Sequence, residues 1–193
     1  PPLQGQIERS DLFCVCSPTI AIYFYYDHMT VPSYSSIEIR PITNGEISLL
    51  RHFLYLAIYI PEGVAAPSEN IVDAPELSGY IDSFGEMNGD ICFVAEAGGV
   101  VVGAVWSRIF DGYGHLDNKT PVLAISLDKD YRGMGIGTRL LFRMIDELAV
   151  CGYERVSLSV QKANYAFKWY LKMGFIVAGG DDEEALLVYY LRT

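Results

Sequence analysis

The chain has 193 residues, of which 51% are hydrophobic and 20% charged, and its formal net charge is −10. This length and composition fit one soluble globular domain. The acidic balance argues against nucleic acid as a partner, because affinity for a phosphate backbone needs a basic face, and it is compatible with cationic substrates such as amines. No apolar run is long enough to span a bilayer.

Residues 1–35 show no clear periodicity, and we treat them as an N-terminal extension to a domain over residues 36–193. Under one interpretation His28-Met29 is a tag junction or an alternative start, and the residues before it are not native. The segment is otherwise either a poorly fixed extension or an added strand formed by the β-branched and aromatic stretch Thr19–Tyr26. We favour the strand, because such a stretch would aggregate if left exposed.

The segment up to residue 84 is expected to hold one strand and two helices. Ile37–Arg40 alternates between apolar and polar residues and stops before a proline, which predicts a first strand. Asn44 is expected to cap a helix whose apolar positions continue to Ala57. Proline and glycine interrupt residues 61–75, which predicts a loop with partial helix, and a short helix is expected over residues 76–84.

The rest of the chain alternates strands and helices. Two strands over residues 91–96 and 100–109 are joined through Gly98-Gly99, which is a hairpin signal, and a polar turn separates them from an apolar strand over 122–127. The remaining expected elements are a helix over 137–150, a strand over 155–160, a helix over 164–173 and a closing strand over 184–191. This order predicts an α/β (α+β) fold with a mixed, mainly antiparallel central sheet and helices on both faces.

A glycine loop, Arg132–Gly137, connects the apolar strand to the next helix. Glycine lets the backbone approach a phosphate, and the N–H groups at a helix N-terminus favour an anion, so a pyrophosphate site is expected. A P-loop would need Gly-Lys-Ser/Thr, but Gly137 is followed directly by Thr138. A dinucleotide fingerprint would need Gly-x-Gly-x-x-Gly and an acidic residue after the next strand, where Gln161 stands. A general nucleotide-binding protein is therefore disfavoured.

Two motifs resemble those of the GNAT superfamily of CoA-dependent N-acyltransferases. Arg132–Gly137 is similar to its R/Q-x-x-G-x-G/A signature, and Asn164–Phe175 is similar to its N-x-A-x-x-x-Y-x-x-x-G-F segment. The motifs stand in the family's order, one helix and one strand apart, and the resemblance covers residues 37–190. It implies the GNAT-like acyl-CoA N-acyltransferase fold, acetyl-CoA as co-substrate and no metal.

The resemblance also implies how acetyl-CoA is held. Backbone N–H groups would bind the pyrophosphate, and these come from Gly133, Met134, Gly135, Ile136, Gly137 and Thr138. Thr138 would add its hydroxyl, and Arg132 would pair with a phosphate or with the loop. The backbone of Ile125, Ser126 and Leu127 would bind the pantetheine arm as another strand does, and would offer an N–H to the thioester oxyanion. Asn164 would bind the pantetheine, cap its helix, or do both.

Acetyl transfer to an amine involves two proton transfers, one to the departing CoA thiolate and one from the amine, and each needs a group to carry it. In the family motif a tyrosine stands at Tyr170, where a phenol can protonate the departing CoA thiolate as a general acid; the alternative is an aromatic packed in the core. A general base must take a proton from the amine. Many family members have a glutamate near Val122, and valine cannot replace it. Glu96, His115 and Asp117 are the candidate bases, and a chain of water molecules is an equal alternative.

We therefore predict an N-acetyltransferase that moves an acetyl group from acetyl-CoA to a primary amine directly, in a ternary complex. No cysteine lies in a motif that would suggest a covalent acyl-enzyme. The alternative is a non-catalytic acyl-CoA-binding module in which the missing glutamate marks lost chemistry. The acceptor is a small-molecule or peptide amine that the sequence does not specify, and a homodimer is left open. Without a Cys-x-x-Cys pair, the 4 cysteines favour reduced thiols in a cytoplasmic protein.

Overall fold

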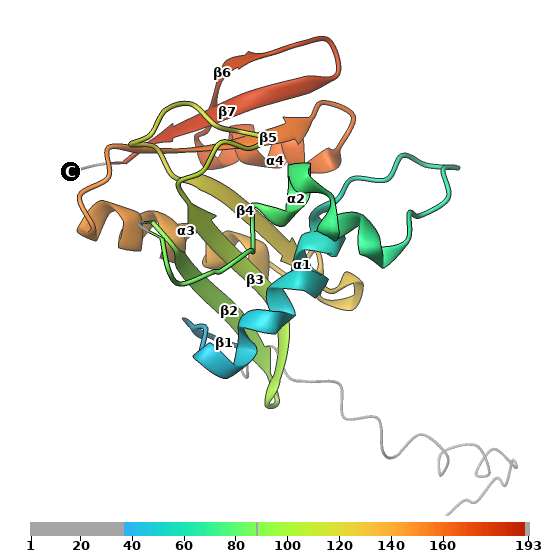
Figure 1. The fold of residues 1–193 in the computed structure, drawn as a ribbon, viewed down its shortest axis with the longest axis vertical. Coiled ribbons are helices and arrows are strands. Elements are labelled where there is room, and N and C mark those ends of the chain that lie inside the picture. The colour runs from blue at the N-terminus through green and yellow to red at the C-terminus, as the bar shows by residue number, and fades with distance from the viewer. Residues whose placement is uncertain (1–36, 88, 192–193) are drawn as a thin grey trace, which may run out of the picture. The chain divides into compact units, whose positions relative to one another are not determined.

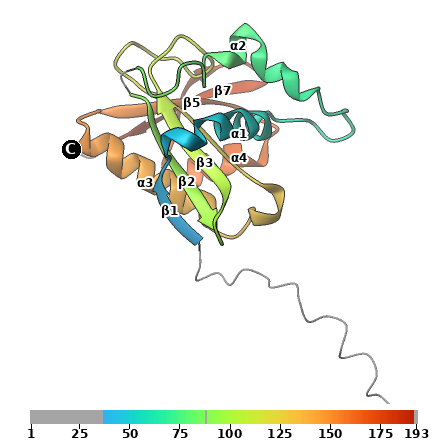
Figure 2. The ribbon, with the colours of Figure 1, turned by 60° about the horizontal axis from the view of Figure 1, so that its bottom comes forward.

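The computed structural model describes residues 37–87 and 89–191, which form a seven-stranded sheet flanked by helices (Figures 1 and 2). The strand order is β1-β2-β3-β4-β5-β7-β6. Neighbouring strands are antiparallel except β4 and β5, which are parallel, so the expected mixed and mainly antiparallel sheet is confirmed. The expected N-terminal extension, including Thr19–Tyr26, lies outside the described residues.

Most elements have the bounds that the sequence predicted to within two residues. The strands are β1 (Ile37–Pro41), β2 (Ile91–Ala97), β3 (Val100–Arg108), β4 (Val122–Leu127), β5 (Arg155–Gln161), β6 (Ile176–Gly180) and β7 (Glu184–Tyr190). The α-helices are α1 (Leu50–Ala57), α2 (Pro75–Ser78), α3 (Ile136–Val150) and α4 (Tyr165–Met173). The 3-10 helices are η2 (Asn44–Leu49), η3 (Glu69–Asp73) and η4 (Lys129–Tyr131).

The predicted cap of the first helix was wrong. The helix begins as η2 and continues as α1, and its N-cap is Thr43 rather than Asn44. The N–H and the hydroxyl of Thr43 donate to one carboxylate oxygen of Glu46 at 2.9 and 2.8 Å, so a capping box fixes the start one residue earlier.

The strand predicted over 184–191 is present as β7, but the prediction that it closes the sheet was wrong. β7 lies between β5 and β6, and β6, which was not predicted, is the strand at that edge of the sheet. All of β6 is exposed, with Ile176 and Val177 exposed by 52% and 53%, so it lacks the alternation of buried and exposed positions that marks a half-buried strand.

Two hydrophobic cores lie on the two faces of the sheet. On one face α1 packs over β3 and β4, with Phe53 and Trp106 almost fully buried. On the other face α3 packs over β1 to β4 and α4 over β5, and this core contains Met144 and Tyr170. In Figure 1 α1 lies in front of the sheet and α3 and α4 lie behind it, so the expectation of helices on both faces is confirmed.

A buried ion pair fixes the segment before β2 to the sheet. The Arg108 and Asp90 side chains are only 2% and 1% exposed, and their closest N–O distance is 2.8 Å. Arg108 also donates to the carbonyl oxygens of Gly79 and Asp82 at 2.8 and 2.7 Å. Because Tyr80 lies within the segment that Arg108 holds, the ion pair also positions that side chain.

Candidate active site

The strands β4 and β5 pair at one position and then part. Val122 pairs with Ser157, whose N–H donates to the carbonyl of Pro121 at 3.0 Å, and no further pair joins these two fully described strands. Figure 1 shows β5 running at a steep angle to β4. We call the region between 123–127 and 158–161 the β4–β5 divergence.

The β4 backbone presents unpaired groups to this divergence. The N–H of Asp128 donates to the carbonyl of Val102 in β3, at 2.9 Å. Because antiparallel ladders alternate, the backbone groups of Ser126 also face β3, and those of Ile125 and Leu127 face the divergence. The Leu127 carbonyl accepts from Arg132 Nε, and the other groups form a short strand edge to which an extended chain can bond.

Ser126 is not brought to the divergence. It pairs with Ala104 of β3, and its hydroxyl donates to the carbonyl of Phe53 at 2.6 Å. Of the three β4 residues expected to bind pantetheine, Ser126 therefore has its backbone turned away, because successive strand residues face opposite edges.

The glycine loop after β4 is closed by its own arginine. Arg132 Nε donates to the carbonyl of Leu127 at 2.9 Å, so the guanidinium holds the loop against the end of the strand. Gly133 and Gly135 have φ of 75° and 77°, a left-handed conformation that glycine adopts without strain. Met134 between them is 37% exposed. The loop therefore keeps a backbone surface with little side-chain cover.

The first turn of α3 leaves its backbone donors available. Gly135 is its N-cap and no side chain caps the helix, so the first N–H groups are free to bind an anion. The Ile136 side chain is buried in the core, which leaves only its backbone for a ligand. A Cβ on Gly137 would lie 3.4 Å from a Leu127 methyl, and the Thr138 hydroxyl accepts from the indole N–H of Trp169 at 3.4 Å.

Helix α4 carries the two remaining motif residues. Asn164 Oδ1 accepts the N–H of Ala166 at 2.9 Å, so its capping role is present. Tyr170 is 7% exposed and packs against Trp169 and Phe175. Burial, with a smaller contribution from Tyr165, raises the pKa of the Tyr170 phenol, which therefore keeps its proton at neutral pH.

Glu96 does not reach the divergence. It lies on β2, with β3 and β4 between it and β5, and its carboxylate accepts from Arg40 Nε at 2.8 Å. Arg40 also pairs with Glu46, so the three side chains form a network that ties β1 and β2 to η2. Val122 is 2% exposed and packs in the core under α1.

Asp117 lies at the paired end of β4 and β5 rather than at the divergence. It accepts the N–H of Lys119 at 2.9 Å, the Thr120 hydroxyl at 2.8 Å and the Arg155 guanidinium at 2.5 Å. These interactions, led by the Lys119 N–H, lower the pKa of Asp117 to about 2. Its oxygens are therefore engaged in holding the loop to the start of β5.

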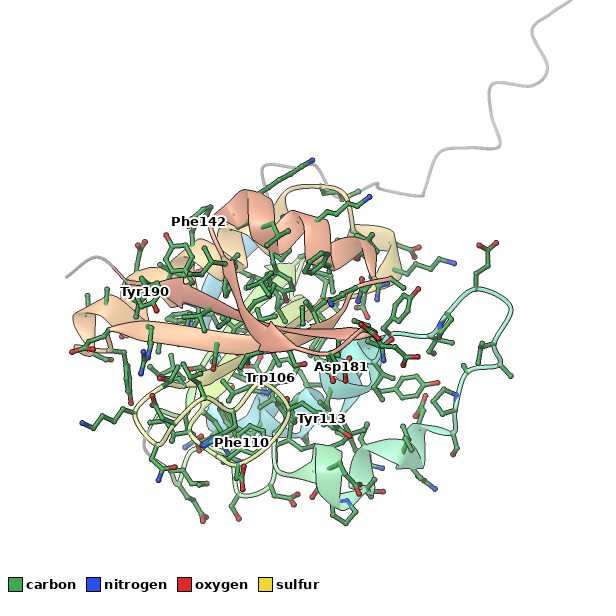
Figure 3. The ribbon with its side chains drawn as sticks, turned by 90° about the horizontal axis from the view of Figure 1, so that it is seen from above. Trp106, Phe110, Tyr113, Phe142, Asp181 and Tyr190 are labelled. Atoms are coloured by element: carbon green, nitrogen blue, oxygen red, sulfur yellow. The ribbon has the colours of Figure 1, made fainter. Side chains whose placement is uncertain are left out.

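The loop between β3 and β4 packs against β5 next to the divergence. A Cβ on Gly114 would lie 2.7 Å from the backbone nitrogen of Ser159, so the two backbones touch. The adjacent His115 is half-buried, with its Nδ1 at 2.9 Å from the carbonyl oxygen of Phe110. Figure 3 shows Phe110 and Tyr113 on one side of β5 and β7 and Phe142 of α3 on the other.

The structure brings to this loop a carboxylate, Glu184, that no motif of the sequence indicates. The Ser159 hydroxyl on β5 donates to Glu184 on β7, and the hydroxyl of Tyr80 donates to the carbonyl of Tyr113. Burial, followed by the negative charge of Glu184, raises the pKa of Tyr80, which is 9% exposed. In the sequence Ser159 is an ordinary strand residue and Glu184 the last of an acidic run, so only the pairing of β5 with β7 connects them.

Other features do not add to this site. Among residues 37–87 and 89–191 no three His, Cys, Asp or Glu side chains are grouped so as to hold a metal ion. None of the helices within these bounds is long and apolar enough to cross a membrane. Two surface pockets lie outside the β4–β5 divergence. One of about 470 Å³ is lined by Lys119 and Arg155, and one of about 310 Å³ is lined by Ile42 and Phe84.

Comparison with known sequences connects these features to other proteins. A model of the Acetyltransferase (GNAT) family matches residues 61–175. L-amino acid N-acyltransferase MnaT of Escherichia coli (strain K12) is 34% identical over 89 residues, which are 44% of this chain and 49% of the relative. An uncharacterized N-acetyltransferase of Methanocaldococcus jannaschii is 31% identical over 120 residues, 60% of this chain and 69% of the relative. The chain thus matches about half of the length of the first relative.

Comparison with solved structures supports the same fold. The PaiA N-acetyltransferase from Thermoplasma acidophilum, in complex with coenzyme A, aligns with a TM-score of 0.60 and 22% sequence identity. The alignment covers 80% of this chain and 99% of that one. The expected acyl-CoA N-acyltransferase fold is confirmed.

Proposed function

The chain belongs to the acetyltransferase (GNAT) family, and on this premise we propose that it transfers an acetyl group from acetyl-CoA to a primary amine within a ternary complex. The observation that carries the proposal is the continuity between the unpaired edge of β4 and the uncapped N-terminus of α3. An extended arm with a pyrophosphate at its end fits both parts at once, which a free phosphate or a simple nucleotide does not.

Binding of acetyl-CoA is assigned to backbone groups. The N–H groups of residues 133–138 would receive the pyrophosphate at the positive end of α3. The backbone of Ile125 and Leu127 would bond the pantetheine arm as a strand. Arg132, whose Nε holds the loop, would present the rest of its guanidinium to a phosphate.

Acetyl transfer needs an oxyanion donor and a proton for the leaving group. The N–H of Ile125, fixed in β4 and without a strand partner, would stabilise the charge that develops on the thioester oxygen. Tyr170 would protonate the CoA sulfur from the α4 side, because its raised pKa keeps the phenol protonated at neutral pH. Glu96 is held by Arg40 and Asp117 by Arg155, so we assign the base role to neither.

The charge distribution supports a cationic acceptor. The turn between β6 and β7 carries Asp181, Asp182 and Glu183, Glu184 begins β7, and the chain as a whole has a net charge of −10. A negative field concentrates cations and disfavours acceptors with a free carboxylate. We therefore propose a small-molecule amine or the N-terminus of a peptide, and a reaction that uses no metal. The free thiols of Cys92 and Cys151 are compatible with the proposed cytoplasmic location.

A thiol-release assay tests this function. The protein is mixed with acetyl-CoA and, in turn, spermidine, an L-amino acid and a short peptide with a free α-amino group, and released CoA is measured with a thiol dye. We expect release that depends on the amine and is faster with spermidine or the peptide. Binding of acetyl-CoA without amine-dependent release across the panel would instead support the non-catalytic acyl-CoA-binding alternative.

A further inference from the structure

Ser159 and Glu184 form a hydroxyl–carboxylate pair beside the β4–β5 divergence. Ser159 lies two residues beyond Ser157, the only β5 residue that pairs with β4. Its hydroxyl donates to Glu184 Oε1 on the neighbouring strand β7. The flanking Leu158 and Val160 pack into the core on the α3 side, so strand alternation places the Ser159 side chain on the α1 side. The pair therefore lies where a nucleophile would approach the divergence from that side.

Two other segments enclose the pair. The backbone of Gly114 lies directly against that of Ser159, and the neighbouring Tyr113 accepts a hydrogen bond from Tyr80. Tyr80 is buried, and the charge of Glu184 acts on its phenol. Figure 3 places Asp181, in the turn before Glu184, on the same side of the strands as Tyr113. The carboxylate is thus partly screened from solvent.

Glu184 differs from the carboxylates of Glu96 and Asp117 because no arginine holds it. Among the described residues its carboxylate forms no ion pair, whereas Glu96 pairs with Arg40 and Asp117 with Arg155. A carboxylate paired with a guanidinium is held ionised and accepts a proton poorly. Charged residues linked to the same turn are Asp181, whose carboxylate accepts the Glu184 N–H at 2.8 Å, and Lys162, which donates to the backbone carbonyl of Asp181.

We propose that the Ser159–Glu184 pair accepts the proton of the acceptor amine, an inference that rests on the acetyl transfer proposed above. Tyr170 lies in the core on the α3 and α4 side of the sheet, and the pair lies on the α1 side. After addition to the thioester, the attacking nitrogen and the departing sulfur are separate substituents of the carbonyl carbon, so different residues can serve their proton transfers. Placing the base and the acid on opposite faces of the divergence therefore serves both proton transfers without competition.

Two protons leave the acceptor nitrogen during the reaction. The ammonium gives a proton to Ser159 Oγ as Ser159 gives its own to Glu184, which returns it to solvent. The neutral nitrogen then attacks the thioester carbonyl, so that the N–C bond forms and the C–S bond breaks. The sulfur takes a proton from Tyr170, and the second proton lost by nitrogen as the amide forms replaces it. One proton is released for each acetyl group transferred.

Three variants test the proposal. Glu184→Gln removes the carboxylate and keeps its shape, Ser159→Ala removes the hydroxyl, and Glu183→Gln is the matched control on the neighbouring exposed residue. Each is assayed over a range of pH with spermidine and with the peptide, and its melting temperature is measured with and without acetyl-CoA. For Glu184→Gln we expect kcat/KM to fall by about 10²–10⁴-fold, with loss of the acidic limb of the pH profile and an unchanged acetyl-CoA shift. For Ser159→Ala, kcat/KM should also fall. Glu183→Gln removes one negative charge from the same acidic run, so it should keep the parent kcat and acidic limb with at most a small rise in KM.

Two results would overturn the inference while the proposed function stands. One is a kcat/KM of the Glu184→Gln variant that lies within threefold of the parent value. The other is a parallel loss of activity and of the acetyl-CoA shift in Glu184→Gln or Ser159→Ala, which would reduce the pair to a structural link between β5 and β7. A parent protein that binds acetyl-CoA and acetylates no amine would instead refute the proposed function itself.

Discussion

A negative charge at Gly135 is the sharpest perturbation of the proposed pyrophosphate site. Gly135 has φ 77°, and a Cβ there meets no atom within 4 Å, so a side chain has room in the free protein. For Gly135→Asp the left-handed backbone costs roughly 1–2 kcal/mol and the helix dipole offsets about 0.3–1 kcal/mol, so the free protein should remain folded. A carboxylate about 4 Å from one phosphate charge repels it by about 1 kcal/mol in water and about 4 kcal/mol at an effective dielectric of about 20. Two pyrophosphate charges double these values, so acetyl-CoA should bind at least about 30-fold more weakly.

The expected readout is the shift in melting temperature that acetyl-CoA causes. At about 100 times its Kd a ligand adds about 2.7 kcal/mol to stability, which for a chain of this size is about 5–11 °C. At the same concentration Gly135→Asp should shift by about 3 °C or less, measured from its own ligand-free value. Gly135→Asn is the matched control, because asparagine tolerates the same backbone and carries no charge, and its shift should stay closer to that of the parent. Equal shifts for the aspartate variant and the parent would refute the assignment of this loop.

Three further outcomes are expected. Tyr170→Phe should lower kcat by about 10²–10⁴-fold with an unchanged acetyl-CoA shift, since only a transition-state contact is lost; parent-like rates would return Tyr170 to a packing role. Asp90→Asn leaves Arg108 buried without its counter-charge and should cost about 3–5 kcal/mol in urea unfolding, whereas Asp73→Asn at an exposed ion pair should leave the midpoint unchanged. The pKa of Asp117 is lowered from 3.8 to about 2, so its contribution to stability is present above pH 3.8 and is lost as the pH falls toward about 2. Asp117→Asn should flatten the decline of the urea midpoint over this pH range, and an unchanged slope would contradict the effect.

The sequence predicted correctly those elements whose ends are determined by nearby residues, such as helix caps and terminal glycines. The α4 helix has its Asn164 cap and ends at Gly174 in a left-handed conformation, as its motif indicated. β6 was missed because an exposed edge strand buries neither face and so carries no periodic signal. The cap at Thr43 was assigned to Asn44 because both residue types cap helices, and only the position of Glu46 decides between them.

The parts of the candidate site that are formed by residues close in sequence could be predicted. The parts that depend on how strands pair could not. The glycine loop and its helix are neighbours in sequence, so their spacing alone indicates an anion site. Which β4 residues face the divergence depends on the register with β3, and this register turns Ser126 away. Ser159 and Glu184 are 25 residues apart in the chain, and their contact exists only because β7 returns beside β5.

Because β4 and β5 pair at a single position, some backbone amides in the middle of this sheet should exchange hydrogen as rapidly as those of an edge strand. Backbone amides within a paired ladder are protected, whereas those of Ile125 and Leu127 have no strand opposite them and should exchange rapidly until a ligand covers them. An unpaired strand on the outside of a protein invites aggregation with other chains. Here the unpaired groups lie inside the sheet, on a strand between β3 and β5, rather than on an outer strand such as β6.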